Sequence, residues 1–370
     1  MPYIKSFRIE GLAGRDGVTA RILNKDVNVF FGPNGSGKTS LLRILHSALI
    51  HKADLLKEVP FNSSEIVICS WANEEYKYQI DKSLFEVAQR AKPGARFLTS
   101  GRSHPEWQIT PSDDTPWLHA YLPIARLYEG STSAELGIFG TRDDSEMGLE
   151  ARFASNLLAT WKDYTRRHSQ NLNKIQEEGL ARILERVLSR TEPSTTNQFT
   201  DSSTAYEAVS TFLARRGVHK ITPSSDEFSK RYSREPQFRG LVRDIEEVEK
   251  KIAAANAPIK ALAQLIREMF IGGKDLSLKD DAIEVAIAGK ELSLSMLSSG
   301  EKQLLMILVA TVNASASVIL IDEPELSMHV DWQRRLIPSM RLLNPSAQLI
   351  VATHSPEIMA EIPDNRVFQI

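Results

Sequence analysis

The sequence predicts an α/β fold, in which a mixed β-sheet flanked by helices is interrupted by an inserted helical region. Three observations support this prediction. The glycine-rich segment Gly32–Thr39 stands between a short apolar run and a stretch whose apolar residues have helical spacing. The runs Val318–Ile321 and Gln348–Ala352 are continuously apolar, as is typical of parallel strands covered on both faces. Residues 150–270 instead show charged stretches with helical periodicity and few turn residues.

Composition and charge exclude several classes of protein. Of the 370 residues, 42% are hydrophobic and 25% are charged, which excludes a disordered chain, and the formal net charge of -2 argues against a nucleic-acid coat protein. The single cysteine, Cys69, lies in an apolar run and is expected to be a buried core thiol. The N-terminus lacks the pattern of a secretory signal, and no run reaches the ~20 apolar residues of a membrane span. We therefore expect a cytoplasmic protein with no membrane segment.

The elements follow from local patterns. We expect residues 1–149 and 271–370 to form the split domain, with residues 150–270 as the insertion between them. In the first part of the domain we expect one helix, Leu41–Ile50, and several strands. The expected strands are Tyr3–Ile9, Thr19–Leu23, Val27–Phe31, Ile66–Trp71, Tyr76–Ile80, Trp107–Thr110 and Ala120–Ile124. Turns are expected at 92–94 and 110–116, and a hairpin over 276–294 follows the insertion.

The insertion has the pattern of a short coiled-coil-like arm. Apolar residues from Leu241 to Met269 alternate spacings of four and three, which is typical of one helix pairing with another. Residues 151–190 are the expected mate, and residues 191–203 are an expected loop. Pro258 predicts that the second helix is kinked or broken at that position.

A phosphate-binding loop is the strongest motif of the chain. Its residues are Gly32, Pro33, Asn34, Gly35, Ser36, Gly37, Lys38 and Thr39, followed by Ser40. They match the pattern GxxxxGK[ST] between a strand and a helix, where backbone N–H groups and the helix N-terminus can face phosphates. Lys38 is expected to bridge the β- and γ-phosphates, and the Thr39 hydroxyl to bind Mg²⁺. The sequence therefore predicts a P-loop nucleotide-binding domain.

Two acidic residues end a later apolar strand. Asp322 and Glu323 follow Val318–Ile321 directly, which without the phosphate loop would also suit a solvated turn. In the presence of that loop, Asp322 is expected to be a Mg²⁺ ligand. Glu323 is expected to orient or deprotonate the attacking water. The pair therefore indicates a hydrolase.

Two further motifs permit a structural or a functional interpretation. Ser298, Ser299, Gly300 and Glu301 precede an apolar helical run, and Ser298 with Glu301 has the spacing of a capping box. His354 follows the apolar run Gln348–Ala352, where a histidine is often only structural.

The four motifs in this order resemble the ATP-binding-cassette (ABC) ATPases, and the Ser-Gly-Glu-Lys-Gln version of the signature is similar to the SMC, RecF and OLD branch. The resemblance implies ATP and Mg²⁺ as ligands, and an ABC-type head domain. It implies that Ser298, Ser299, Gly300 and Glu301 bind the γ-phosphate held by a second copy, which makes an ATP-sandwiched homodimer. It also implies that His354 is a catalytic switch that senses the γ-phosphate. Lys38 and Glu323 complete the implied catalytic set.

The chain resembles the stand-alone ATPase subunits of anti-phage systems such as Septu, PARIS and retron operons. The insertion is too short for the arms of chromosomal SMC proteins, and only sixteen residues follow His354, so a nuclease domain like that of OLD proteins is not expected. The resemblance implies a separate effector protein, expected to be a nuclease, controlled by ATP-dependent closure, with larger homo-oligomers left open. The alternative is a RecF-like repair ATPase that clamps DNA.

Two points stay open in the sequence. Basic clusters at 166–168, 215–216 and 230–234 could contact nucleic-acid phosphates or could form a solvated helix face. Many cassette ATPases carry a glutamine after a strand like Tyr121–Pro123, but Arg126 is found in that region instead. Gln79 and Gln108 are alternative candidates, so the coupling residue is unassigned.

Overall fold

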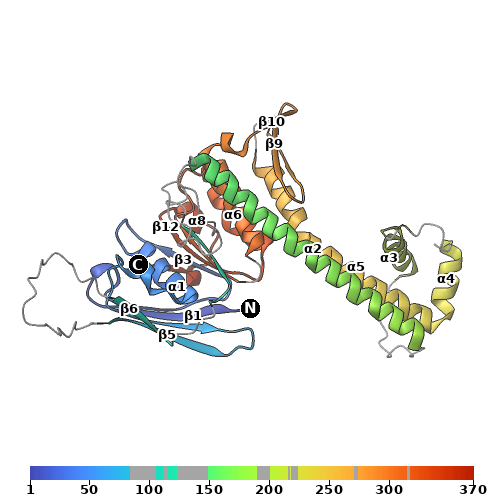
Figure 1. Ribbon diagram of the computed structural model, residues 1–370, viewed down its shortest axis with the longest axis horizontal. Helices are drawn as coiled ribbons and strands as arrows, with labels where there is room; N and C mark the ends of the chain where they lie inside the picture. Colours follow the sequence, from blue (N-terminus) through green and yellow to red (C-terminus); the bar gives the residue numbers. More distant parts are fainter. Residues whose placement is uncertain are drawn as a thin grey trace, which may run out of the picture. The chain divides into compact units, whose positions relative to one another are not determined.

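The structure is a computed structural model. It describes residues 1–83, 106–111, 116–123, 149–189, 201–215, 217, 224–270, 274–314 and 317–370. Several expected features lie outside these residues: the turn at 92–94, Ile124, Arg126, Arg216 and residues 191–200 of the expected loop 191–203. The extension of that loop to Ser203 is wrong, because Asp201 caps a helix that begins at Ser202. The predicted α/β fold of a P-loop ATPase with an inserted helical region is confirmed (Figure 1).

The chain divides into two compact units. The first contains residues 1–162 and 261–370, and the second contains residues 163–260. Among the described helices, none combines the length and apolar composition needed to cross a membrane.

A five-stranded parallel sheet forms the centre of the first unit. In spatial order its strands are β13 (Val367–Gln369), β3 (Val27–Phe31), β12 (Gln348–Thr353), β11 (Val318–Asp322) and β7 (His119–Pro123). Every residue of β7, β11 and β12 is buried. For β11 and β12 this burial was predicted from their continuously apolar sequences. The register pairs Asp322 with Ala352 and with Pro123, so the carboxyl ends of these strands meet at one edge.

Helix α1 (Lys38–Ile50) packs between this sheet and a second, antiparallel sheet (Figure 1). The strands of the second sheet are β2 (Val18–Ile22), β1 (Tyr3–Glu10), β4 (Ser63–Cys69), β5 (Glu75–Ser83) and β6 (Glu106–Thr110), with short 3₁₀ turns η1 (Leu12–Gly14) and η2 (Ala53–Leu56) beside them. One apolar core joins the three layers and includes Leu45 of α1, Ile66 of β4 and Leu320 of β11. Cys69 is buried as predicted.

The region after the insertion begins with a small three-stranded sheet. Its strands are β8 (Lys274–Leu278), β9 (Ile283–Ile287) and β10 (Lys290–Leu292). The expected extension of the hairpin to Leu294 is wrong, because Ser293 caps a 3₁₀ turn, η4 (Leu294–Met296). The remaining helices are α6 (Ser299–Asn313), α7 (Val330–Leu343), α8 (Pro356–Met359) and the 3₁₀ turn η5 (Asp364–Arg366). Helix α6 is buried from Gly300 to its end.

The second unit is helical. Its elements are parts of α2 (Leu149–Ser189) and α5 (Pro236–Met269), together with α3 (Ser202–Ala214) and α4 (Ser225–Arg234). Helices α2 and α5 approach closely at Gly179, where a Cβ atom would lie 2.3 Å from a methyl group of Val248. Arg182 pairs with Glu247 at 2.9 Å on the same two helices.

Helix α5 continues through Pro258, so of the two predicted outcomes, a kink or a break, the break is wrong. Proline has no backbone N–H, so the carbonyl group of Ala254 loses its helical hydrogen bond. Ala254 is exposed, so water can donate to this carbonyl group instead. Buried stripe residues on both sides, Ile252 and Leu262, stabilise the helical conformation through packing.

Candidate functional site

The loop from Gly32 to Gly37 joins strand β3 to helix α1. Gly35 and Gly37 have φ angles of 76° and 103°, in the region that favours glycine. Gly37 caps α1 and offers no side-chain acceptor, and the first helical turn holds no acidic residue. The backbone N–H groups at the start of α1 are therefore available to an anion.

The residues of the predicted phosphate-binding loop differ in how far they are exposed to solvent. Pro33, Asn34 and Gly35 are exposed, whereas the side chain of Ser36 is buried. The Ser36 hydroxyl has no hydrogen-bond partner in the described part of the chain, as expected of a group that a ligand completes. Thr39 and Ser40 of the predicted set lie in the first turn of α1.

The ammonium group of Lys38 is held at the centre of the site. It donates to the carbonyl oxygens of Gly32 at 2.9 Å and Pro33 at 3.2 Å. It also lies 3.0 Å from Nε2 of His354. Burial lowers the pKa of Lys38, although the neighbouring carboxylates, that of Glu323 foremost, act in the opposite direction.

The carboxyl group of Asp322 has the environment of a cation ligand. Burial raises its pKa from the ordinary 3.8 to about 6, while a hydrogen bond from the Thr39 side chain acts to lower it. Its Oδ1 atom is buried and has no hydrogen-bond partner among the described residues. Asp322 and Thr39 therefore fit a Mg²⁺ ion, which typically takes one or two protein ligands and completes its shell with phosphates and water.

Glu323 and His354 meet at the ends of adjacent strands. Nε2 of His354 lies 3.0 Å from Oε1 of Glu323 and 3.0 Å from Nζ of Lys38. One ring nitrogen cannot serve both neighbours at once: it donates to Glu323 when protonated and accepts from Lys38 when not. The φ angle of Glu323 is 51°, an uncommon conformation for a non-glycine residue, of the kind that concentrates at functional sites.

Glu325 is a member of the site that the sequence did not assign. Its Oε1 atom accepts hydrogen bonds from the backbone N–H of His354 at 2.6 Å and of Ser355 at 3.2 Å. The Ser355 hydroxyl donates to Gln333 at 2.6 Å, and Gln333 donates to the carbonyl oxygen of Met328 at 2.8 Å. These bonds join the segment after β11 to the segment after β12.

The residues of the signature motif divide between an exposed pair and a buried pair. Ser298 and Ser299 are exposed, and Ser298 with Glu301 forms the capping box of α6. The Glu301 carboxylate also accepts from Lys274, at 2.6 Å through each oxygen. At Gly300 an added Cβ atom would lie 2.3 Å from the carbonyl oxygen of Ser327. The side-chain hydrogen bonds described for Ser298 and Glu301 join these two residues to each other and Glu301 to Lys274. None of these bonds reaches the phosphate-binding loop of the same chain.

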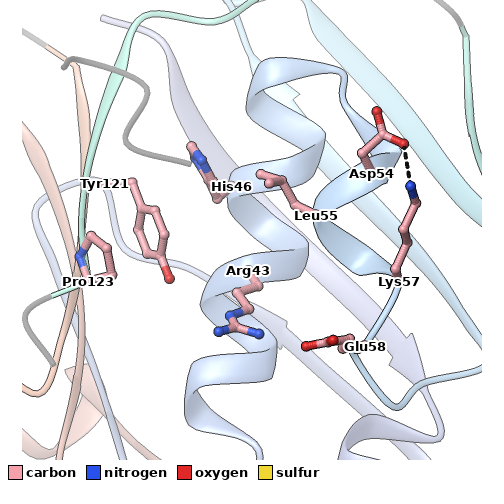
Figure 2. A pocket seen from close by; sticks show the side chains of 8 residues that line it. All are labelled: Arg43, His46, Asp54, Leu55, Lys57, Glu58, Tyr121 and Pro123. Carbon is pink, nitrogen blue, oxygen red and sulfur yellow. Dashed lines mark ion pairs between the residues drawn. The ribbon is translucent and has the colours of Figure 1, made fainter. Parts of the chain in front are cut away.

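A cavity of about 250 Å³ lies beside α1 and is lined by residues of α1, the η2 region and β7 (Figure 2). Its lining includes Arg43, one helical turn after Thr39, and Pro123, which pairs with Asp322 in the sheet. The positive charge of Arg43 acts to lower the pKa of Asp322. The lining also carries Glu58 and an Asp54–Lys57 ion pair, so it does not favour one sign of ligand charge (Figure 2).

Several missed residues carry no motif of their own. Three of them contact the motifs only through tertiary structure, namely Lys274, Gln333 and Arg15. The Arg15 guanidinium, for example, donates to the carbonyl oxygen of Gly35 at 3.3 Å. Glu325 could have been found, because it stands two residues after Glu323 in an acidic run. Gln79 and Gln108 are exposed on the antiparallel sheet, so no contact in the described residues supports either as the coupling glutamine.

The basic clusters of the insertion are largely ion-paired in the second unit. Arg166 and Arg167 both contact Asp163, at 2.7 and 3.0 Å. Arg215 pairs with Glu249 at 2.7 Å. Arg231, of the third cluster, pairs with Glu235 at 3.2 Å. These ion pairs favour the interpretation of a solvated helix surface.

Comparison with known proteins gives a family. The model of the AAA_23 family, described as "AAA domain", matches residues 22–284. The model of AAA_21, described as "AAA domain, putative AbiEii toxin, Type IV TA system", matches residues 244–360.

Curated relatives match a shorter stretch. Retron Ec83 probable ATPase of Escherichia coli is 28% identical over 112 residues, which are 26% of this chain and 21% of the relative. Septu protein PtuA of Bacillus thuringiensis is 27% identical over 111 residues, which are 25% of this chain and 28% of the relative. The matches thus span only 21% and 28% of these two relatives. The resemblance to retron and Septu ATPases that the motifs indicated is confirmed by these similarities.

Among solved structures, the Smc head domain bound to the C-terminal domain of ScpA from Pyrococcus furiosus aligns with 97% of this chain and 92% of its own. Its sequence identity is 16% and its TM-score is 0.44.

Proposed function

The chain belongs to the AAA domain family, and we propose that it binds ATP with Mg²⁺ and hydrolyses it at the edge of the parallel sheet. One observation carries this proposal. Lys38 and His354 are 316 residues apart in the sequence, yet their side chains lie 3.0 Å apart, with Glu323 at 3.0 Å from the same ring nitrogen. A lysine beside a glycine-rich loop can bind the phosphates, and a carboxylate can orient or deprotonate the attacking water. An imidazole in contact with both can orient them.

Each group has a role that its position supports. The N–H groups at the start of α1 and the ammonium of Lys38 bind the phosphates. Asp322 and Thr39 would hold Mg²⁺, which supplies positive charge beside the β- and γ-phosphates when bound. Glu323 accepts a proton from the attacking water. The oxygen of this water bonds to the γ-phosphorus while the bond between the γ-phosphorus and the β–γ bridging oxygen breaks, and that oxygen leaves with ADP. His354, when protonated at Nε2, donates to Glu323 and orients it.

Turnover and binding measured on the same variants test this proposal. Lys38→Ala is expected to lose ATP binding, because the loop loses its one cation. Glu323→Gln is expected to bind ATP but to hydrolyse it at least about 100-fold more slowly, because it cannot accept the proton. Glu361→Gln, at an exposed position outside the site, is the control. Full turnover by Glu323→Gln would contradict the assignment of the base.

The active form that we propose is a homodimer with ATP between the two copies. Ser298 and Ser299 are exposed at the start of α6, where a second copy can reach them, and Gly300 and Glu301 face inward and fix this end of the helix. The proposal rests on the motif resemblance and on this division of the four residues.

We further propose that the second unit docks a separate effector protein of an anti-phage system. Four large apolar side chains of α2 are exposed on one face, namely Leu180, Leu184, Val187 and Leu188, with exposed fractions of 41 to 82%. Carboxylates of Glu177 and Glu185 are exposed on the same helix, and Glu178 pairs with Lys174 at 3.8 Å. A surface that combines apolar groups with carboxylates is complementary to a protein face with apolar and basic groups.

Co-purification with the products of the neighbouring genes tests this docking surface. The double variant Leu184→Glu, Leu188→Glu is expected to lose the effector while it keeps ATPase activity. Asn173→Glu, an exposed polar position on the same helix, is the control. Recovery of nucleic acid in place of a protein partner, with hydrolysis stimulated by DNA and strongly salt-dependent, would instead support a DNA clamp.

A further inference from the structure

The segment after β11 is held in a conformation that local sequence does not favour. Glu323 and Ser327 have φ angles of 51° and 60°, although neither is glycine. Between them, the carbonyl oxygen of Pro324 accepts a hydrogen bond from the buried Gln303 side chain at 2.6 Å. The backbone N–H of Glu323 donates to the carbonyl oxygen of Ala352 at 2.8 Å. Such strain persists only where surrounding contacts enforce it.

Glu325 connects this strained segment to the histidine of the site. The backbone N–H of His354 donates to Oε1 of Glu325 at 2.6 Å. The neighbouring N–H of Ser355 has a second acceptor, Oγ1 of Thr353 at 2.9 Å, whereas Glu325 is the acceptor described for His354. Removal of the carboxylate would therefore release the backbone of His354 specifically.

Only one oxygen of the Glu325 carboxylate has partners among the described residues. Oε1 accepts the N–H groups of His354 and Ser355, whereas Oε2 is buried and has no hydrogen-bond partner there. The unpaired oxygen costs folding free energy and so offsets part of what the two hydrogen bonds contribute. Both bonds are made at the backbone that carries the His354 ring, and that ring lies between Glu323 and Lys38.

We propose that Glu325 is a positioning residue for hydrolysis: it fixes the backbone of His354 so that Nε2 lies within reach of Glu323. Glu325 acts through His354 and does not contact the nucleotide. This inference rests on the proposed ATPase function of the site.

The test is a double-mutant cycle on steady-state hydrolysis. Glu325→Ala is expected to lower kcat about 10- to 100-fold and to leave the Kd for ATP unchanged, because a misplaced reacting group slows the chemical step. His354→Ala is expected to lower kcat as well. If Glu325 acts through His354, adding Glu325→Ala to the His354→Ala protein lowers kcat less than twofold further. Glu325→Gln keeps an oxygen acceptor for the His354 N–H and is expected to restore most of the activity.

Two controls separate this inference from its alternatives. Glu357→Ala removes a neighbouring carboxylate that pairs with Arg334 and not with the His354 backbone, and it should keep kcat. A purely structural role for Glu325 would lower the melting temperature and multiply with His354→Ala in kcat, which would overturn the inference. Unchanged kcat in Glu325→Ala would also overturn it. Absence of hydrolysis in the wild-type protein would instead refute the proposed function.

Discussion

The carboxyl group of Asp322 shows how a single residue relates stability to function. It ends a fully buried strand, and burial raises its pKa to about 6. Its ordinary pKa in an unfolded chain is 3.8, so the folded protein favours the neutral form. Near neutral pH the ionised carboxylate therefore destabilises the nucleotide-free fold, and a cation beside Oδ1 would offset this effect.

Asp322→Asn tests this assignment in nucleotide-free protein with a metal chelator. The stabilising contribution of the neutral Asp322 is fully present below pH 3.8 and is lost as the pH rises through about 6. Asparagine does not ionise, so the variant should gain about 1 to 2 kcal/mol of stability relative to wild type between pH 5 and pH 8, out of about 3 kcal/mol over the whole titration. Urea unfolding at both pH values measures the difference. An equal effect of the substitution at pH 5 and pH 8 would contradict the raised pKa.

At the scale of elements, the start of α6 is defined by contacts on two sides. The ion pair between Lys274 and Glu301 joins it to strand β8, and Gly300 lets the backbone at Ser327 approach closely. Glycine at position 300 is therefore required by packing and not by its φ angle. The conformation of the Ser298–Ser299 end, which we propose faces a second copy, depends on both contacts.

Gly300→Ala should expose this packing requirement. The added methyl group would meet backbone atoms that cannot move away easily, so the free energy of unfolding should fall by about 1 to 3 kcal/mol. Gly240→Ala in α5 is the comparison, because the nearest atoms to its Cβ belong to the Arg186 side chain, which pairs with Asp244, and not to backbone, so a smaller loss is expected. Chemical denaturation of both variants measures the effect. Equal stability of Gly300→Ala and wild type would show that α6 and Ser327 separate readily.

Sequence patterns predicted elements better than they predicted connections between elements. The parallel strands β11 and β12 were foreseen because buried strands are continuously apolar, and the loop before α1 because phosphate binding restricts its residues. The sequence left open whether α5 is kinked or broken at Pro258, because proline opposes a helix locally and packing on both sides decides whether the helix continues. Glu325 and Lys274 were missed for the same reason: their partners lie 29 and 27 residues away in the chain.

At the scale of the whole molecule, the two units divide the proposed work. The first unit contains the loop, acids and histidine, and the second has ion-paired basic residues and an exposed apolar stripe on α2. The two surfaces that we propose as binding sites differ in character: the start of α6 is polar and suits a phosphate, whereas the apolar stripe on α2 suits a protein. Substitutions in α6 should therefore affect the proposed ATP-dependent closure, and substitutions in the stripe should affect the proposed partner binding.

The mass of the Glu323→Gln protein in solution, with and without ATP and Mg²⁺, tests the central claim most directly. Slow hydrolysis should preserve the ATP-bound state, so we expect the mass of a dimer that forms only with ATP and Mg²⁺. Adding Ser299→Arg should leave ATP binding intact and keep the protein monomeric, because the long side chain would block the second copy. A monomer in the presence of ATP, or unchanged association of the Ser299→Arg protein, would contradict the account.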